Sequence, residues 1–74
     1  MAKLPEDRRA IFTDVYKFYE SHWDMPFTVE AWEQAARDVA ELVRKHDSNP
    51  LMIKLVFAAY DAISDEQKVM MEVI

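Results

Sequence analysis

No glycine occurs anywhere in this chain of 74 residues. Tight β-hairpins depend on glycine, usually after asparagine or aspartate, because their turn residues take positive φ angles. The turns of this chain must therefore be built from proline, aspartate, asparagine and serine, which suit the connections between helices. The sequence accordingly predicts an all-α fold.

Prolines and capping residues divide the chain into helical segments. Pro5 and Pro50 suit first helical positions, where the N–H that proline lacks would have no partner, and Asn49 is expected to cap the helix that Pro50 opens. Pro26 ends the first helix, because the residue before proline avoids helical geometry. Thr28 is a suitable N-cap for the second. We expect a compact bundle of three main helices, about 5–22, 28–46 and 50–63, and a short C-terminal helix, about 65–74.

The last of these boundaries depends on one local motif. Residues 64–67 read Ser-Asp-Glu-Gln, and Gln67 follows Ser64 by three positions, as in a capping box. The motif favours a bend at Ser64. One longer third helix that passes through Ser64 is the alternative.

Apolar residues at steps of three and four predict which helix faces turn inward. In the first helix the row is Phe12, Val15, Tyr16, Tyr19 and Trp23. In the second helix it is Val29, Trp32, Ala36, Val39 and Val43. The third helix is apolar around nearly its whole circumference, which is typical of a central helix or of one that contributes to an interface.

Aromatic residues gather at the first turn: five of the nine lie between Phe18 and Trp32. With Thr28 as N-cap, Phe27 and Trp32 occupy the positions of a hydrophobic staple. We interpret the cluster as one end of the core, with a peptide-binding groove as the alternative. Phe18, which lies off the apolar row, and His22, which lies beside the turn, remain candidates for contact with another molecule.

Several chemistries are excluded or disfavoured by residue type. Phosphate loops, dinucleotide fingerprints and nucleophile elbows all need glycine, and without cysteine there is neither a disulfide nor a thiolate zinc site. His22 and His46 each have an aspartate nearby, but not at the spacing of a metal-binding pair. We interpret both as capping or surface residues, and we expect no catalytic, cofactor-binding or metal site.

The charged residues indicate a solvated surface rather than a nucleic-acid interface. Along the second helix, opposite charges alternate at Glu33, Arg37, Glu41 and Lys45, a spacing that supports an exposed helix. The net charge of −5 disfavours direct binding to nucleic acid or to an anionic membrane, although a basic partner protein is compatible. We expect a cytoplasmic protein, because no apolar run approaches a membrane span and no signal peptide precedes the helices.

Residues 14–36, DVYKFYESHWDMPFTVEAWEQAA, resemble a group of small uncharacterised helical proteins of phages and integrative elements in Gram-positive bacteria. The resemblance implies an accessory role in the cytoplasm. It favours an inhibitor or host-takeover function, and it implies no site residues.

The sequence predicts one domain, 1–74, that acts as a non-enzymatic protein–protein interaction module. Its apolar surface exceeds what one small bundle can bury, so we expect a homodimer. The expected interface lies on the last two helices, at Leu51, Met52, Leu55, Phe57, Met70, Met71, Val73 and Ile74. An acidic inhibitor of a nucleic-acid-binding host or defence protein is the alternative, and a small metal- or cofactor-binding protein is a third possibility.

Overall fold

Three helices make up the part of the chain that the computed structural model describes, residues 4–73, with side chains described as far as Val69. They are α1 (Glu6–His22), α2 (Val29–Lys45) and α3 (Pro50–Val73). Within this range no residue belongs to a β-strand. The prediction of an all-α fold is confirmed.

Both predicted N-caps between the helices are confirmed. The Thr28 hydroxyl oxygen accepts a hydrogen bond from the Ala31 backbone N–H at 3.1 Å, at the start of α2. The Asn49 side-chain oxygen accepts one from the Leu51 N–H at 2.9 Å, at the start of α3. Each bond satisfies a backbone donor that has no partner within its own helix.

The turn between α2 and α3 shows how the chain manages without glycine. The Asp47 N–H donates to the Arg44 carbonyl at 3.1 Å, and the Ser48 N–H donates to the Val43 carbonyl at 2.8 Å. This is the hydrogen-bond pattern of a Schellman motif, in which glycine usually occupies the position of Asp47. Asp47 and Ser48 both adopt positive φ angles, 52° and 56°. Aspartate tolerates this left-handed region better than most residues.

The predicted break at Ser64 is wrong, because α3 continues as one helix to Val73. Gln67, the expected capping partner of Ser64, is instead largely buried. Its side-chain oxygen accepts a hydrogen bond from Trp32 Nε1, and its amide nitrogen donates to the Met25 carbonyl, both at 2.9 Å. These contacts with α2 and the first turn hold the segment after Ser64 in helical register with the buried Ile63.

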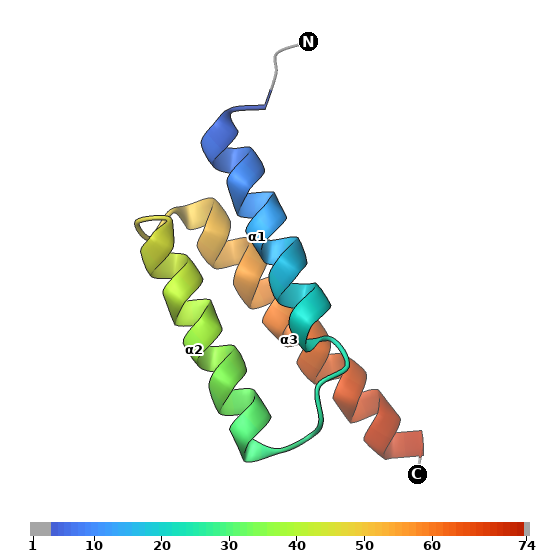
Figure 1. The fold of residues 1–74 in the computed structure, drawn as a ribbon. Helices are drawn as coiled ribbons and strands as arrows, with labels where there is room; N and C mark the ends of the chain where they lie inside the picture. Colours follow the sequence, from blue (N-terminus) through green and yellow to red (C-terminus); the bar gives the residue numbers. More distant parts are fainter. Residues whose placement is uncertain (1–3, 74) are drawn as a thin grey trace.

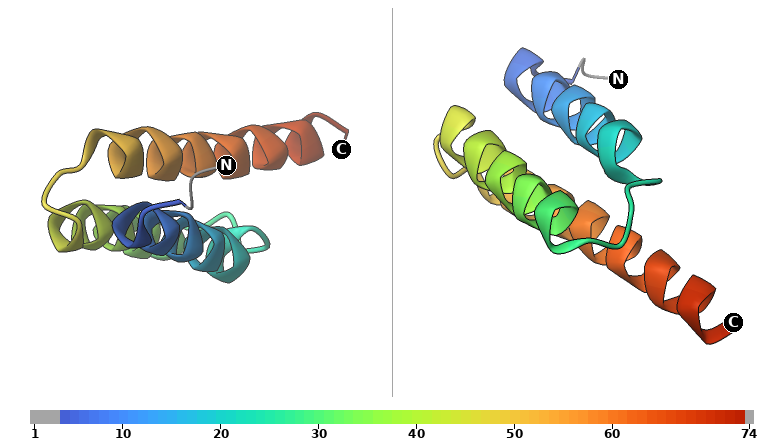
Figure 2. Two further views of the ribbon diagram at one scale, coloured as in Figure 1. Left: turned by 90° about the horizontal axis from the view of Figure 1, so that it is seen from above. Right: turned by 60° about the horizontal axis from the view of Figure 1, so that its bottom comes forward.

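The helices form two layers. Figure 1 shows α1 and α2 running in opposite directions with α3 behind them, and Figure 2 shows α3 as a separate layer. Its 24 residues make α3 longer than α1 or α2, which have 17 each. The structure is therefore elongated, with principal extents of 48 × 26 × 17 Å. The core between the layers consists of Ile11, Phe18, Ala35, Val39, Met52, Val56 and Ile63.

The inward face of α1 differs in part from the predicted one, since Val15 and Tyr19 of the expected row do pack against the core. Phe12, Tyr16 and Trp23 are 48%, 65% and 53% exposed, whereas Ile11 and Phe18 are 1% and 4% exposed. The helix is thus rotated by about one residue, roughly 100°, from the expected orientation. The local pattern selected the row richest in aromatic residues, whereas packing against α3 buries Ile11 and Phe18.

A smaller rotation affects α2. Ala35 and Val39 are buried, while Val29, which the pattern placed in the core, is mostly exposed. Trp32 is half-buried and packs edge-to-face on Tyr60 of α3, with ring centroids 5.0 Å apart. Its expected staple partner, Phe27, is 64% exposed. The aromatic turn is therefore only partly an end of the core.

Candidate functional site

An apolar groove runs between α2 and α3, on the side of α2 away from α1. It has a volume of about 610 Å³. Its lining comes from both helices and the turn that joins them: Ala36, Val39, Ala40, Val43, Arg44, Ser48, Ile53, Phe57 and Tyr60. Phe57 is 48% exposed, so a large apolar side chain borders the groove and remains accessible to a partner.

A second hollow of about 440 Å³ adjoins this groove at the start of α2. It shares Ala36 and Tyr60 with the groove. Its other lining residues are Phe27, Thr28, Val29, Trp32 and Glu33. We call the two hollows together the α2–α3 groove.

The depth of the groove follows from side-chain size. Ala36 and Ala40 lie one helical turn apart on α2 and are both exposed, so short side chains face the bulkier Ile53 and Phe57 of α3. Small residues on one side and large ones on the other leave a furrow of the kind that accepts an amphipathic helix. Exposed Phe27 and Val29 extend the apolar surface beyond the furrow.

Only part of the predicted interface reaches this groove. Phe57 lines it, whereas Met52 is fully buried inside the chain and has no side-chain surface left for a partner. Leu51 and Leu55 are half-buried and pack against the core cluster. The side chains of Met70, Met71 and Val73, and all of Ile74, lie outside the described residues.

Phe57 is the only residue of the groove lining that was predicted as an interface residue, and sequence reasoning missed Ile53 and Tyr60 on the same helix. A signal for them was present. Ile53 and Phe57 are four residues apart and Tyr60 follows three later, so they share one face of α3. On an apolar helix this row does not stand out, because neighbouring rows are equally apolar.

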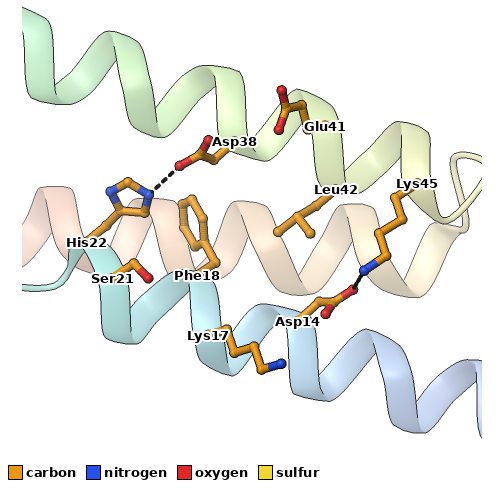
Figure 3. A pocket seen from close by; sticks show the side chains of 9 residues that line it. All are labelled: Asp14, Lys17, Phe18, Ser21, His22, Asp38, Glu41, Leu42 and Lys45. Atoms are coloured by element: carbon orange, nitrogen blue, oxygen red, sulfur yellow. Dashed lines mark hydrogen bonds and ion pairs between the residues drawn. The ribbon is translucent and has the colours of Figure 1, made fainter.

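A polar pocket of about 370 Å³ lies between α1 and α2, on the face opposite α3 (Figure 3). At one end, His22 of α1 and Asp38 of α2 point toward one another, with Nε2 and Oδ2 separated by 2.7 Å. At the other end, Lys45 Nζ of α2 lies 3.0 Å from Asp14 Oδ2 of α1. Asp14 also pairs with His46 Nε2 at 2.7 Å.

These pairs revise the interpretation of the histidines. Both do lie at helix C-termini: His22 ends α1 and His46 caps α2. Their side chains, however, are only 11% exposed each, so the prediction of a surface histidine is wrong. Their carboxylate partners are distant in sequence, and are not the neighbouring aspartates. Only the antiparallel arrangement of α1 and α2 brings each pair together.

The carboxylate of Asp14 contacts two basic side chains, those of Lys45 and His46. Burial by itself would raise the pKa of Asp14, but the hydrogen bonds and charges of His46 and Lys45 outweigh it and lower the pKa below the usual range. The ionised form of Asp14 is thus the form that the fold stabilises. We interpret the contacts of Asp14 with Lys45 and His46 as an electrostatic link between α1 and the end of α2.

The polar pocket does not contain a hydrogen-bonded pair of serine and histidine side chains. Ser21 lines it beside His22, but among the hydrogen bonds of residues 4–69 none joins the two side chains. A serine nucleophile needs such a base within hydrogen-bond reach. Within the same residues, no group of three or more His, Asp or Glu side chains is placed to hold a metal ion.

The outer face of α1 is a second exposed apolar surface. It carries Phe12, Tyr16 and Trp23, and none of these three residues lines the α2–α3 groove or the polar pocket. A hydrogen bond with the Glu20 carboxylate raises the pKa of Tyr16, and one with Glu66 at 2.6 Å raises the pKa of Tyr19.

Comparison of the chain with protein-family models, curated proteins and solved structures finds no match. None of the helices within residues 4–73 combines the length and the apolar character needed to cross a bilayer. The α2–α3 groove is therefore the candidate functional site on the strength of its geometry alone.

Proposed function

We propose that this protein is a cytoplasmic, non-enzymatic interaction module that self-associates through the α2–α3 groove. The observation that carries the proposal is the groove itself, an apolar furrow bordered by the half-exposed ring of Phe57. Contiguous apolar surface is costly on a monomer and marks interaction sites. A domain of this size also buries too little surface to be very stable alone, so association supports the fold as well.

Sedimentation velocity from about 1 to about 200 μM tests the proposal. The wild-type chain is expected to shift from monomer to dimer as its concentration rises. Phe57→Ser is expected to keep the protein monomeric, because it removes the large apolar side chain from the groove. Phe12→Ser is the matched control, since Phe12 is also 48% exposed but lies on the outer face of α1.

A wild-type chain that stays monomeric throughout this range would contradict self-association. A dimer that Phe12→Ser disrupts and Phe57→Ser leaves intact would place the interface on the outer face of α1. Circular dichroism of both variants shows whether either substitution alters the helical fold.

An acidic inhibitor of a nucleic-acid-binding protein is the second candidate, supported by the net charge of −5. Such a mimic would need a continuous acidic face that repeats the spacing of phosphates. The exposed row on α2 alternates in sign, and Arg37 lies 3.9 Å from Glu33 in one of its pairs. This alternation counts against a phosphate mimic, so we favour the interaction module. Binding to a column of immobilised basic protein would test the inhibitor.

A further inference from the structure

The outward face of α3 carries charged residues that do not line the α2–α3 groove. Lys54, Phe57, Ala58 and Asp61 are all exposed, and their spacing places them on one side of the helix. The ion pairs found among the described residues involve other side chains. Lys54 and Asp61 are thus available to charges on another molecule.

We propose that the partner is a second copy of this chain, whose α3 docks antiparallel on the outward face of α3, beside the α2–α3 groove, about a two-fold axis between Phe57 and Ala58. In this register, Lys54 of each copy faces Asp61 of the other. The proposal rests on the proposed function and specifies the partner and its orientation.

The argument for this orientation is self-complementarity. Lys54 and Asp61 are two helical turns apart, and the point midway between them falls between residues 57 and 58. A two-fold axis at that point relates the two α3 helices as an antiparallel pair. Lys54 of the first copy then faces Asp61 of the second, and Asp61 of the first faces Lys54 of the second. A parallel, in-register pairing would instead place Lys54 beside Lys54 and Asp61 beside Asp61, and these like charges repel one another.

The balance of charge on this face also supports contact between two copies. Each chain carries a net charge of −5, so most pairs of surfaces repel one another. Among the residues of α3 whose side chains are described, up to Val69, the exposed charged residues on the outward face are Lys54, Asp61, Asp65 and Lys68. The charges of these four residues sum to zero, so this part of α3 adds no net repulsion of its own to a contact between two acidic chains.

Packing at the proposed axis is compatible with close approach. Ala58 has a short side chain and lies next to Phe57, so the opposing helix can come near and cover both phenylalanine rings. Helices pack at 8–10 Å when the contact residues allow it. The second α3 then also covers Phe57 where this residue borders the groove.

Charge reversal tests the register. Lys54→Asp and Asp61→Lys are each expected to raise the dimer dissociation constant about tenfold, because each single change creates two like-charged contacts. The double variant K54D/D61K restores opposite charges and is expected to return within about threefold of wild type. An equimolar mixture of the two single variants is likewise expected to form a heterodimer.

Arg8→Asp and Asp24→Lys are the matched controls, since they make the same changes in net charge at exposed positions outside α3. Dimerisation at wild-type strength in both single α3 variants, or failure of the double variant to recover, would overturn the register. If Phe57→Ser alone still abolishes the dimer in that case, the proposed function survives. A wild-type chain that is monomeric throughout overturns both.

Cysteine cross-linking gives an independent readout, because the natural chain contains no cysteine. Ala58→Cys lies at the proposed axis and is expected to form a disulfide-linked dimer readily under mild oxidation. Ala10→Cys, an exposed position on α1, is expected to form little. Equal cross-linking of the two variants would contradict the antiparallel α3 pairing.

Discussion

At the scale of single residues, two reciprocal histidine–aspartate pairs join α1 to α2. His22 of α1 reaches Asp38 of α2, and His46 at the end of α2 reaches Asp14 of α1, each at 2.7 Å. Because α1 and α2 run in opposite directions, the pairs lie at opposite ends of the polar pocket. They compensate for the limited apolar contact between these two helices, which pack mainly on α3.

The pairing of Asp14 predicts a specific loss of stability in acid. Its pKa is lowered in the folded chain, so its ionised form stabilises the fold above the unfolded-state pKa of about 3.9. That contribution disappears as the pH falls through the lower folded-state pKa. Asp14→Asn is expected to cost about 1 kcal/mol at pH 7 and to weaken the fall in stability below about pH 4.

Urea unfolding of the two proteins between about pH 3 and pH 7 measures this difference. Asp24→Asn, at an exposed position in the first turn, is the control and is expected to change stability little. An Asp14→Asn variant with the same pH dependence as wild type would contradict the role of Asp14.

At the scale of elements, the continuity of α3 depends on a contact that is far away in sequence. Gln67 joins α3 to Trp32 of α2 and to the carbonyl of Met25 in the first turn. A capping box at Ser64 would need the same side chain to turn back on its own segment. The Gln67 side chain cannot make both sets of contacts. Its buried contacts satisfy the Trp32 N–H and the Met25 carbonyl.

Gln67→Ala is expected to destabilise the fold by about 1–3 kcal/mol, because it leaves the Trp32 N–H and the Met25 carbonyl without their partner. Chemical denaturation monitored by tryptophan fluorescence provides the measurement. Gln34→Ala is the matched control: this residue is exposed and bonds only to Asp38 within α2, so a change within about 0.5 kcal/mol is expected. Equal effects of the two substitutions would argue against the network.

At the scale of the whole molecule, the chain is more extended than a compact globule of its length. Its Cα radius of gyration is 13.7 Å, whereas about 11 Å is typical of a 74-residue domain. The cause is the long α3, which projects past the layer formed by α1 and α2 (Figure 1). A single long helix with an exposed outward face is well suited to pairing with a second copy.

Self-association predicts a melting temperature that depends on protein concentration. A hundredfold rise in concentration is expected to raise the Tm of the wild-type chain by about 5 °C or more, since dimer formation stabilises only the folded state. Phe57→Ser is expected to show no such dependence. Thermal unfolding followed by circular dichroism at low and high concentration measures both, and a constant Tm for the wild-type chain would count against dimerisation.

The sequence by itself determined the fold class and most helix ends. The lack of glycine, the cap at Thr28 and the Asn49–Pro50 start of α3 act on the backbone within a few residues, so their effect does not depend on distant contacts. Phe57 was predicted as an interface residue from the excess of apolar residues; it lines the α2–α3 groove, and its part in an interface stays a prediction.

Only the tertiary structure decided which faces are buried and which distant side chains meet. Local hydrophobicity alone favours burying the row of α1 with Phe12, Tyr16 and Trp23, which has the larger apolar surface. Packing against α3 selects Ile11 and Phe18. The partners of His22 and of Gln67 follow from the same packing, because residues far apart in sequence meet only once the layers are assembled. The α2–α3 groove is a property of two helices together, and neither shows it alone.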